Sequence, residues 1–400
     1  MTTIVKAANA AEFLGLVPQL LGCHVERSLV LVPFIGPRTG GAMRVDLPPD
    51  PDADVDAFAG TVLGMICKVA DVDGVALIVY CPEQFGEEGP AMPRRRLIDA
   101  LTERARRIGL RVVDALCVAA DAWGSYLDDP PGAGAPLTAI AVAARPGEAP
   151  LPTPAADPLA ACALPAVDLA AKEYVGRALI AIEEAVELLY RPPREGRRAG
   201  ERRFDPRALG SVVALDDLPA FFEHALTLDP DELDPFVAAM LIWCLDRPSL
   251  RDVAISGWYG GLSAADTALD AQLRWEDGEA YPEEHAAFMW GDGPRPDARR
   301  LERAVDLMRR LAASAPRVRR PGTLATASWL SWALGRSSHA AHFAGEALRI
   351  DPEHGLSEIV LTLVGAGHLP EWAFTREHAG DPLTADPLAV PPEPTWRALT

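Results

Sequence analysis

The stretch that decides the fold of this chain reads Phe13-Leu-Gly-Leu-Val-Pro-Gln-Leu-Leu-Gly-Cys-His-Val-Glu-Arg-Ser-Leu-Val-Leu-Val32. It predicts a helix that ends at Gly22, because glycine readily adopts the left-handed conformation that terminates helices. A buried strand follows from Ser28 to Ile35, where an apolar run is closed by Gly36-Pro37. The polar residues between helix and strand form either the rim of a site or a local polar clasp: His24, Glu26, Arg27 and Ser28.

The region up to residue 145 continues with alternating strands and helices. Strands at 29–35 and 41–47, joined by a glycine- and proline-containing turn, predict a hairpin. Helices are expected at 54–69 and 94–109, and further strands at 74–80, 110–119 and 137–143. This order predicts an N-terminal α/β sandwich with a mixed sheet at residues 1–145.

After residue 155 the pattern becomes helical. One apolar stripe at helical spacing consists of Val175, Leu179, Ile182, Val186 and Leu189. Further helices are expected at 218–226, 235–245, 264–273, 297–312, 324–334 and 338–348. We therefore predict an all-α domain at residues 159–380.

Proline and arginine mark the boundaries of these parts. The segment 146–158 is proline-rich and is expected to be an extended linker. The polar, glycine-interrupted stretch near 191–207 predicts an exposed loop, and residues 381–400 predict a tail with little structure of its own.

Small residues near the end of the helical part resemble a tetratricopeptide unit. If Pro352 occupies the last marked position, then Gly335, Ala340 and Ala347 fall where two closely crossing helices need small side chains. A single unit cannot bury its own apolar face, so this tetratricopeptide-like hairpin must stack on neighbouring helices.

Several short pieces in order also resemble a known family. They are Leu21-Gly-Cys-His-Val-Glu-Arg-Ser-Leu-Val30, Arg44-Val-Asp-Leu-Pro48, Leu250-Arg-Asp-Val253 and Trp329-Leu-Ser-Trp-Ala-Leu-Gly335, followed by Ala347-Leu-Arg-Ile-Asp-Pro352. The chain is similar to the uncharacterised, mainly actinobacterial domain-of-unknown-function family 4192. The resemblance implies a shared fold and no established activity. Residues 122–135 lack the arginine and cysteine cluster of the family pattern, so no metal or thiol role is transferred there.

Composition and missing motifs restrict the function. A net charge of −19 argues against binding to nucleic acid or anionic membranes. No apolar run is long enough for a membrane helix, and the six cysteines are isolated, as in reduced cytoplasmic proteins. Dinucleotide, P-loop and nucleophile-elbow motifs are absent from the sequence, so no cofactor is predicted. We expect a soluble, cytoplasmic protein.

The polar cluster after the first helix is the leading candidate for a ligand site. His24 beside Glu26 has the composition of a general base, and Arg27 suits an anionic ligand. The structural alternative is that Glu26 pairs with Arg27 while Ser28 hydrogen-bonds the turn.

A second pair of charges lies on the next predicted strand. Arg44 and Asp46 alternate with apolar residues, so they share one face and can join the first cluster or form one exposed ion pair. Residues after a later strand are candidates for the same region: Asp121, Trp123, Ser125 and Tyr126.

No metal site is predicted. His339, His342 and Glu346 have helical spacing that suits zinc, but the tetratricopeptide register places them on an outer, solvated face.

Two functions of different class remain, and the residues leave open whether the protein is an enzyme. The favoured hypothesis is a protein-interaction or scaffold module, because the helical part contains tryptophans that could form a partner groove: Trp243, Trp258, Trp275, Trp290, Trp329 and Trp332. The alternative is a small-molecule or catalytic site on the α/β part, formed by the residues His24, Glu26, Arg27, Ser28, Arg44 and Asp46. The partner, any substrate and the oligomeric state are not specified by the sequence.

Overall fold

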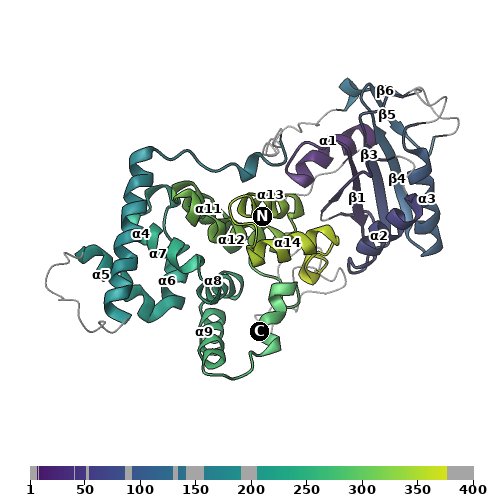
Figure 1. Cartoon of the computed structure of the whole chain (residues 1–400). Coiled ribbons are helices and arrows are strands. Elements are labelled where there is room, and N and C mark those ends of the chain that lie inside the picture. The colour runs from purple at the N-terminus through teal and green to yellow at the C-terminus, as the bar shows by residue number, and fades with distance from the viewer. Residues whose placement is uncertain are drawn as a thin grey trace, which may run out of the picture. The chain divides into compact units, whose positions relative to one another are not determined.

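The computed structural model divides into two compact units (Figure 1). The first contains the residues up to Pro158 and those from Phe374 onward, and the second runs from Leu159 to Ala373. The residues that the structure describes are 7, 9–39, 41–50, 54–85, 92–128, 134–140, 157–190 and 205–375. Most of the predicted linker and of the loop near 191–207, and the whole tail 381–400, therefore lie outside the described residues.

The first unit is built on a mixed sheet of six described strands in the order β2-β1-β3-β4-β5-β6. Strands β3 and β4 are parallel, and the other neighbouring pairs are antiparallel. The predicted mixed sheet is confirmed, including the hairpin of the first two strands. The strand bounds are β1 Ser28–Phe34, β2 Met43–Asp46, β3 Gly74–Tyr80, β4 Arg111–Val118, β5 Ala122–Ser125 and β6 Ala135–Pro136.

Helices cover both faces of this sheet (Figure 1). Helix α1 (Ala10–Leu21) packs through Leu14 and Val17 on one face, which we call the α1 face. Helices α2 (Val55–Cys67) and α3 (Arg95–Arg107) pack on the opposite face. Because successive side chains of a strand point to opposite faces, a central strand must be apolar on both, as β3 is in the sequence.

The last strands of the sheet differ from the prediction. Strand β5 was not predicted, and it pairs with the end of β4. A strand was predicted at 137–143, but Leu137–Ala139 forms a 3-10 turn and the strand pairing ends at Pro136, while 141–143 lie outside the described residues. Proline lacks the amide that would continue the ladder, which accounts for the early end of β6.

The second unit is helical, as predicted. Its described α-helices are α4 Leu169–Tyr190, α5 Pro206–Val212, α6 Leu218–Ala225, α7 Pro235–Leu245, α8 Pro248–Gly260, α9 Leu262–Glu276, α10 Glu283–Ala286, α11 Ala298–Ser314, α12 Pro321–Ala333, α13 Ser337–Leu348 and α14 Gly355–Gly365. On α4, the predicted apolar stripe is buried at Val175, Leu179 and Ile182, but Leu189 near the end of the helix is exposed.

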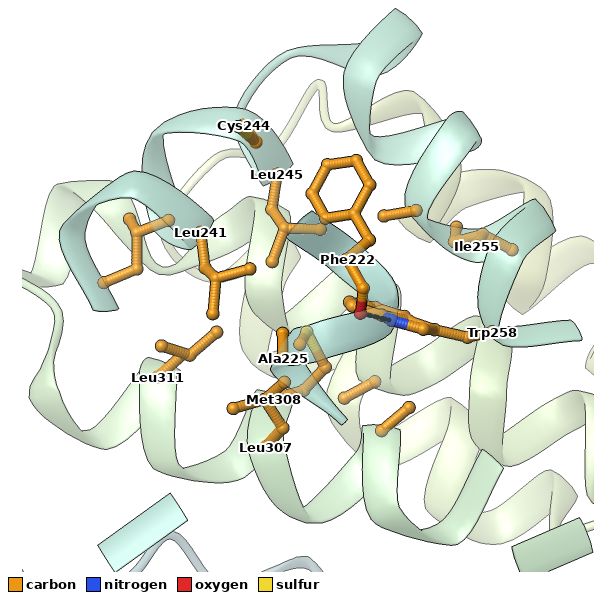
Figure 2. Packing of buried hydrophobic residues seen from close by; sticks show 14 of the residues in the cluster. Phe222, Ala225, Leu241, Cys244, Leu245, Ile255, Trp258, Leu307, Met308 and Leu311 are labelled. Atoms are coloured by element: carbon orange, nitrogen blue, oxygen red, sulfur yellow. Dashed lines mark hydrogen bonds between the residues drawn. The ribbon is translucent and has the colours of Figure 1, made fainter. Parts of the chain in front are cut away.

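The core of the second unit forms around Trp258 of α8 (Figure 2). Its indole nitrogen donates a hydrogen bond of 3.0 Å to the carbonyl oxygen of Phe222 on α6. The two rings meet edge to face at 6.2 Å. Residues Leu241 of α7 and Met308 of α11 belong to the same buried cluster. A buried indole with its N–H satisfied contributes its full apolar area to stability.

The glycine-rich stretch 257–260 is helical, although glycine is a poor helix former. It forms the last turn of α8, which ends at Gly261 with φ 84°. A Cβ atom on Gly257 would lie 2.9 Å from the Cβ of Ala265 on α9, and one on Gly260 would lie 2.7 Å from that of Ala264. The glycines are therefore needed because α8 and α9 pack closely, and packing overrides their weak helix propensity.

Two charged contacts and one close approach join the helices of this unit. The Arg300 guanidinium holds the Glu223 carboxylate through two hydrogen bonds of 2.8 and 2.6 Å. Arg319 lies 2.7 Å from the carboxylate of Asp246. Gly322, in the first turn of α12, approaches Leu245 so closely that a Cβ atom would lie 2.4 Å from its carbonyl oxygen.

Among the described residues, no helix is both long and apolar enough to cross a lipid bilayer. All six cysteines are free thiols.

Candidate functional site

The predicted polar cluster lies on the connection between α1 and β1. Gly22 ends α1 with φ 72°, as predicted. The side chains of His24, Glu26 and Arg27 are exposed, and within the described chain neither the His24 ring nor the Glu26 carboxylate takes part in a hydrogen bond or ion pair. Ser28 is buried and its hydroxyl donates to the backbone carbonyl of Glu26 at 2.7 Å. The serine thus stabilises the turn, whereas the other three side chains face solvent.

Arg44 and Asp46 share one face of β2, as predicted. In the ladder Arg44 lies opposite Val30 and Asp46 opposite Ser28, so both are on the α1 face. Their charged groups are 3.7 Å apart, with Arg44 largely buried and Asp46 exposed. Burial raises the pKa of Cys23, and the positive charge of Arg44 partly offsets this. Arg44 is therefore close to the end of α1.

The ladder also aligns a row of side chains across the sheet on the α1 face. Ser28 of β1 lies opposite Tyr80 of β3, Tyr80 opposite Val118 of β4, and Val118 opposite Trp123 of β5. Residues that face each other in a ladder point to the same side of the sheet. The row lies at the carboxyl ends of β3 and β4, which is the edge where α/β sheets bind ligands.

Three polar atoms in this region are buried and have no hydrogen-bond partner in the described chain. They are the hydroxyl oxygen of Tyr80, the indole nitrogen of Trp123 and the side-chain oxygen of Gln19 on α1. Tyr80 is only 8% exposed. Burial raises the pKa of Tyr80, so its hydroxyl is neutral and keeps its proton at physiological pH. An unpaired buried polar group costs about 1–3 kcal/mol, so three of them on one face require an explanation.

Sequence reasoning did not identify Tyr80 or Gln19, and it named Trp123 only as a residue that follows a strand. Tyr80 is the last residue of an otherwise aliphatic strand, and Gln19 is a polar residue in the last turn of an apolar helix. A polar atom at the tip of a strand and another at the end of the helix that covers it were the available signals.

On the opposite face, the same strand ends hold a pair of thiols. The sulfur atoms of Cys81 and Cys117 are 4.0 Å apart, about twice the length of a disulfide bond. The hydrogen bond that the Cys81 thiol makes to the Cys117 sulfur, together with burial, raises the pKa of Cys81 far above its usual range, so this thiol remains protonated. The buried hydroxyl of Tyr126 donates to the carbonyl of Pro93 at 2.6 Å.

A partly buried ion pair lies next to these thiols. Arg94 is 2.7 Å from Glu83 and also donates to the carbonyl of Pro48 at 3.1 Å. Burial raises the pKa of Glu83, but hydrogen bonds from its own backbone amide and from Arg94 outweigh this effect and lower it. The tyrosine and the arginine on this face have partners, but one oxygen of Glu83 and the hydroxyl of Thr102 are buried without a hydrogen-bond partner in the described chain.

Among the residues that the structure describes, no three or more histidine, cysteine, aspartate or glutamate side chains come together in a group that could hold a metal ion. Glu346, which was considered as a ligand with His339 and His342, instead pairs with Arg349. The α1 face can supply a donor from Trp123, an acceptor from Gln19 and a hydroxyl that does both from Tyr80.

Comparison with known proteins gives one match. The model of a family described as Domain of unknown function (DUF4192) matches residues 11–280. These residues include every strand of the sheet and the helices up to α9. No curated protein and no solved structure matches the chain.

Proposed function

The chain belongs to this family of unknown function, and we propose that its α/β unit binds a small polar molecule on the α1 face, at the carboxyl ends of β3 and β4. The observation that supports the proposal is the set of three buried, unpaired polar atoms on Gln19, Tyr80 and Trp123. A ligand that pairs with them would recover most of the free energy that their burial costs.

One ordered water is a poorer explanation than a ligand. Tyr80 and Trp123 belong to strands separated by β4, and two strand spacings amount to about 9–10 Å. Side chains stand roughly perpendicular to a sheet, so their polar tips are separated by a similar distance. A single water reaches partners only about 3 Å away on each side. A molecule with a donor and an acceptor some 5 Å apart suits the row better.

The surroundings define the ligand further. Ile78 and Val118 supply apolar contacts in the same cluster, and Arg44 adds a guanidinium at the β2 end of the row. We therefore expect a compact neutral or singly anionic metabolite with an apolar body. Exposed His24 and Arg27 lie outside this buried row, so we assign them no contact with the ligand.

A thermal-shift screen of polar metabolites against the full chain tests the proposal. A true ligand at 100 times its Kd stabilises the protein by about 2.7 kcal/mol, which raises the melting temperature measurably. Tyr80→Phe removes one unpaired atom and keeps the ring, so the shift should fall or vanish. Tyr126→Phe is the matched control, because that hydroxyl already has a partner on the opposite face. The proposal fails if no compound shifts the wild type, or if Tyr80→Phe retains the whole shift.

Protein interaction is our second proposal, and it has a narrower basis than the sequence suggested. Four of the six tryptophans expected in a partner groove are buried in the helical core: Trp243, Trp258, Trp329 and Trp332. Trp275 and Trp290 remain 54% and 50% exposed and are the residues that support this function. Exchanging both for serine should abolish the capture of a specific partner that the wild-type chain retains, and capture that is unchanged would count against it.

The tetratricopeptide-like reading of α12 and α13 belongs with this second proposal. It is supported by Gly335, which has φ 75° between the two helices, and by the complete burial of Ala340 and Ala347. Small buried residues at these positions are what a close helix crossing needs.

A further inference from the structure

The two thiols at the ends of β3 and β4 take no part in the proposed ligand site, because they lie on the other face of the sheet. Cys81 directly follows β3 and is 7% exposed, and Cys117 lies within β4 and is fully buried. Both belong to the apolar cluster under α2 and α3. Their sulfur atoms, 4.0 Å apart, are therefore paired in a largely water-free environment.

The geometry of the ladder disfavours a disulfide between them. Cys117 lies opposite Val79, and the amide of Cys81 continues the pairing by donating to the Val118 carbonyl, so Cys81 is two residues further along the neighbouring strand. One strand spacing of about 4.8 Å and a rise of about 6.6 Å place the two Cα atoms about 8 Å apart. A disulfide bridges Cα atoms up to about 7 Å apart, so forming one would require the two central strands to move.

The same separation of the sulfur atoms suits a metal ion that binds both. Two metal–thiolate bonds of about 2.3 Å that meet at about 109–120° place their sulfurs about 3.8–4.0 Å apart. The distance of 4.0 Å between Cys81 and Cys117 fits this range without movement of the strands. Two thiols that only pack in a core have a similar separation, so a third ligand is what distinguishes a metal site.

Met92 supplies a third sulfur beside this pair. Gly124 of β5 lies opposite Cys117, so the two residues share a face of the sheet about 5 Å apart. A Cβ atom on Gly124 would be 3.5 Å from the Cε methyl of Met92, to which the thioether sulfur is bonded. Met92 is 4% exposed and belongs to the same cluster as the thiols. The bare backbone of Gly124 thus lets the thioether lie next to Cys117, and its three rotatable bonds can turn the sulfur toward the pair.

This donor set selects a soft ion. Thiolate and thioether ligands together favour copper(I), whereas magnesium and calcium require oxygen ligands. A structural zinc ion takes four ligands, and among the described residues no three histidine, cysteine, aspartate or glutamate side chains form such a group. The nearby carboxylate of Glu83 is held by Arg94 at 2.7 Å. The three sulfurs are therefore the ligands that the structure offers.

We propose that Cys81, Cys117 and Met92 bind one copper(I) ion on the face of the sheet that α2 and α3 cover. Binding forms bonds from the ion to the three sulfurs and releases the two thiol protons to solvent, with no transfer of electrons. The ion would link the ends of β3 and β4 to the residue that precedes α3 by only a few positions. It is independent of the ligand proposed for the α1 face.

Titration of the reduced full chain with copper(I), supplied as its bicinchoninate complex with ascorbate and without oxygen, tests the proposal. The chain should withdraw one equivalent of copper from the competitor. X-ray absorption of the product should show only sulfur ligands, at about 2.3 Å. The proposal is overturned if the chain withdraws no copper, or if the ion has nitrogen or oxygen ligands.

Substitutions identify the ligands. Loss of an outer-shell partner weakens metal binding by about 10- to 100-fold, so Cys117→Ala should weaken copper(I) binding more than about 100-fold. Met92→Leu keeps the side-chain volume and should weaken it at least about tenfold, which gives a test that does not depend on folding of the cysteine variant.

The matched controls are two other free thiols. Cys244→Ala removes a fully buried thiol from the helical unit and Cys67→Ala removes an exposed one, and each should bind copper(I) within about twofold of the parent. Equal affinities of Cys117→Ala and Cys244→Ala would overturn the site, and parental affinity of Met92→Leu would overturn the three-sulfur set. The proposal is also overturned if oxidised glutathione readily joins Cys81 to Cys117 in the folded chain, since the pair would then be a disulfide couple.

Discussion

Tyr80→Phe should stabilise the protein, although it removes a polar group from a buried tyrosine. The hydroxyl is buried without a hydrogen-bond partner in the described chain, so the wild type carries its desolvation cost with no compensating bond. Phenylalanine keeps the ring and its packing against the α1 face. Removing an unpaired hydroxyl of this kind should raise the free energy of unfolding by about 1–3 kcal/mol.

Hydrogen exchange of the β3 amides (Gly74–Tyr80) reports this gain within the α/β unit, independently of the helical unit. A gain of 1–3 kcal/mol corresponds to a decrease of about 5- to 150-fold in the exchange rate of globally protected amides. Tyr126→Phe is the control of opposite sign, since it leaves the Pro93 carbonyl unpaired and should cost about 0.5–1.5 kcal/mol. Faster exchange in Tyr80→Phe would refute the reasoning, because it would show that the hydroxyl has a partner in solution.

Three further predictions concern the helical unit. Burial raises the pKa of Asp246 to about 6 from its ordinary 3.8, so the stability that its proton provides is complete below about pH 4 and is lost as the pH rises through 6. Asp246→Asn should remove up to about 3 kcal/mol of this pH dependence in urea unfolding between pH 4 and 7. Arg300→Met removes the ion pair with Glu223 and should lower the free energy of unfolding, measured by thermal unfolding, by about 1–2 kcal/mol. Arg177→Met removes the exposed pair with Glu173 and should change it by less than about 0.5 kcal/mol. Gly322→Ala should lower the free energy of unfolding by about 1–3 kcal/mol, because its methyl group would meet a carbonyl oxygen. Gly345→Ala, in open space on α13, should raise it by about 0.5–1 kcal/mol. Equal effects of the two substitutions would contradict this reasoning.

The elements predicted best are those whose side chains are nearly all buried. Strand β3 agrees with its predicted bounds because a sequence of seven buried residues fits a central strand covered on both faces. Helix α7 agrees for the same reason, since it is apolar all round and lies inside the helical core. Strand β5 was missed because Ala122-Trp-Gly-Ser125 has neither an apolar run nor clear alternation, and its pairing with β4 creates the strand.

The candidate site was predicted only in part, because some of its features depend on tertiary packing that no local sequence pattern encodes. The shared face of Arg44 and Asp46 follows from strand periodicity, which the sequence contains. The missing partner of the Tyr80 hydroxyl does not, because it depends on which groups α1 brings over the sheet. Tyrosine is a common strand residue, and nothing local distinguishes a paired hydroxyl from an unpaired one. The four buried tryptophans show the same limit, since a tryptophan serves equally well in a core or at an interface.

The row from Ser28 to Trp123 lies wholly within residues 11–280, so the architecture that supports it belongs to the part of the chain that the family model describes. A site built wholly from the matched region can operate in any member that folds in the same way.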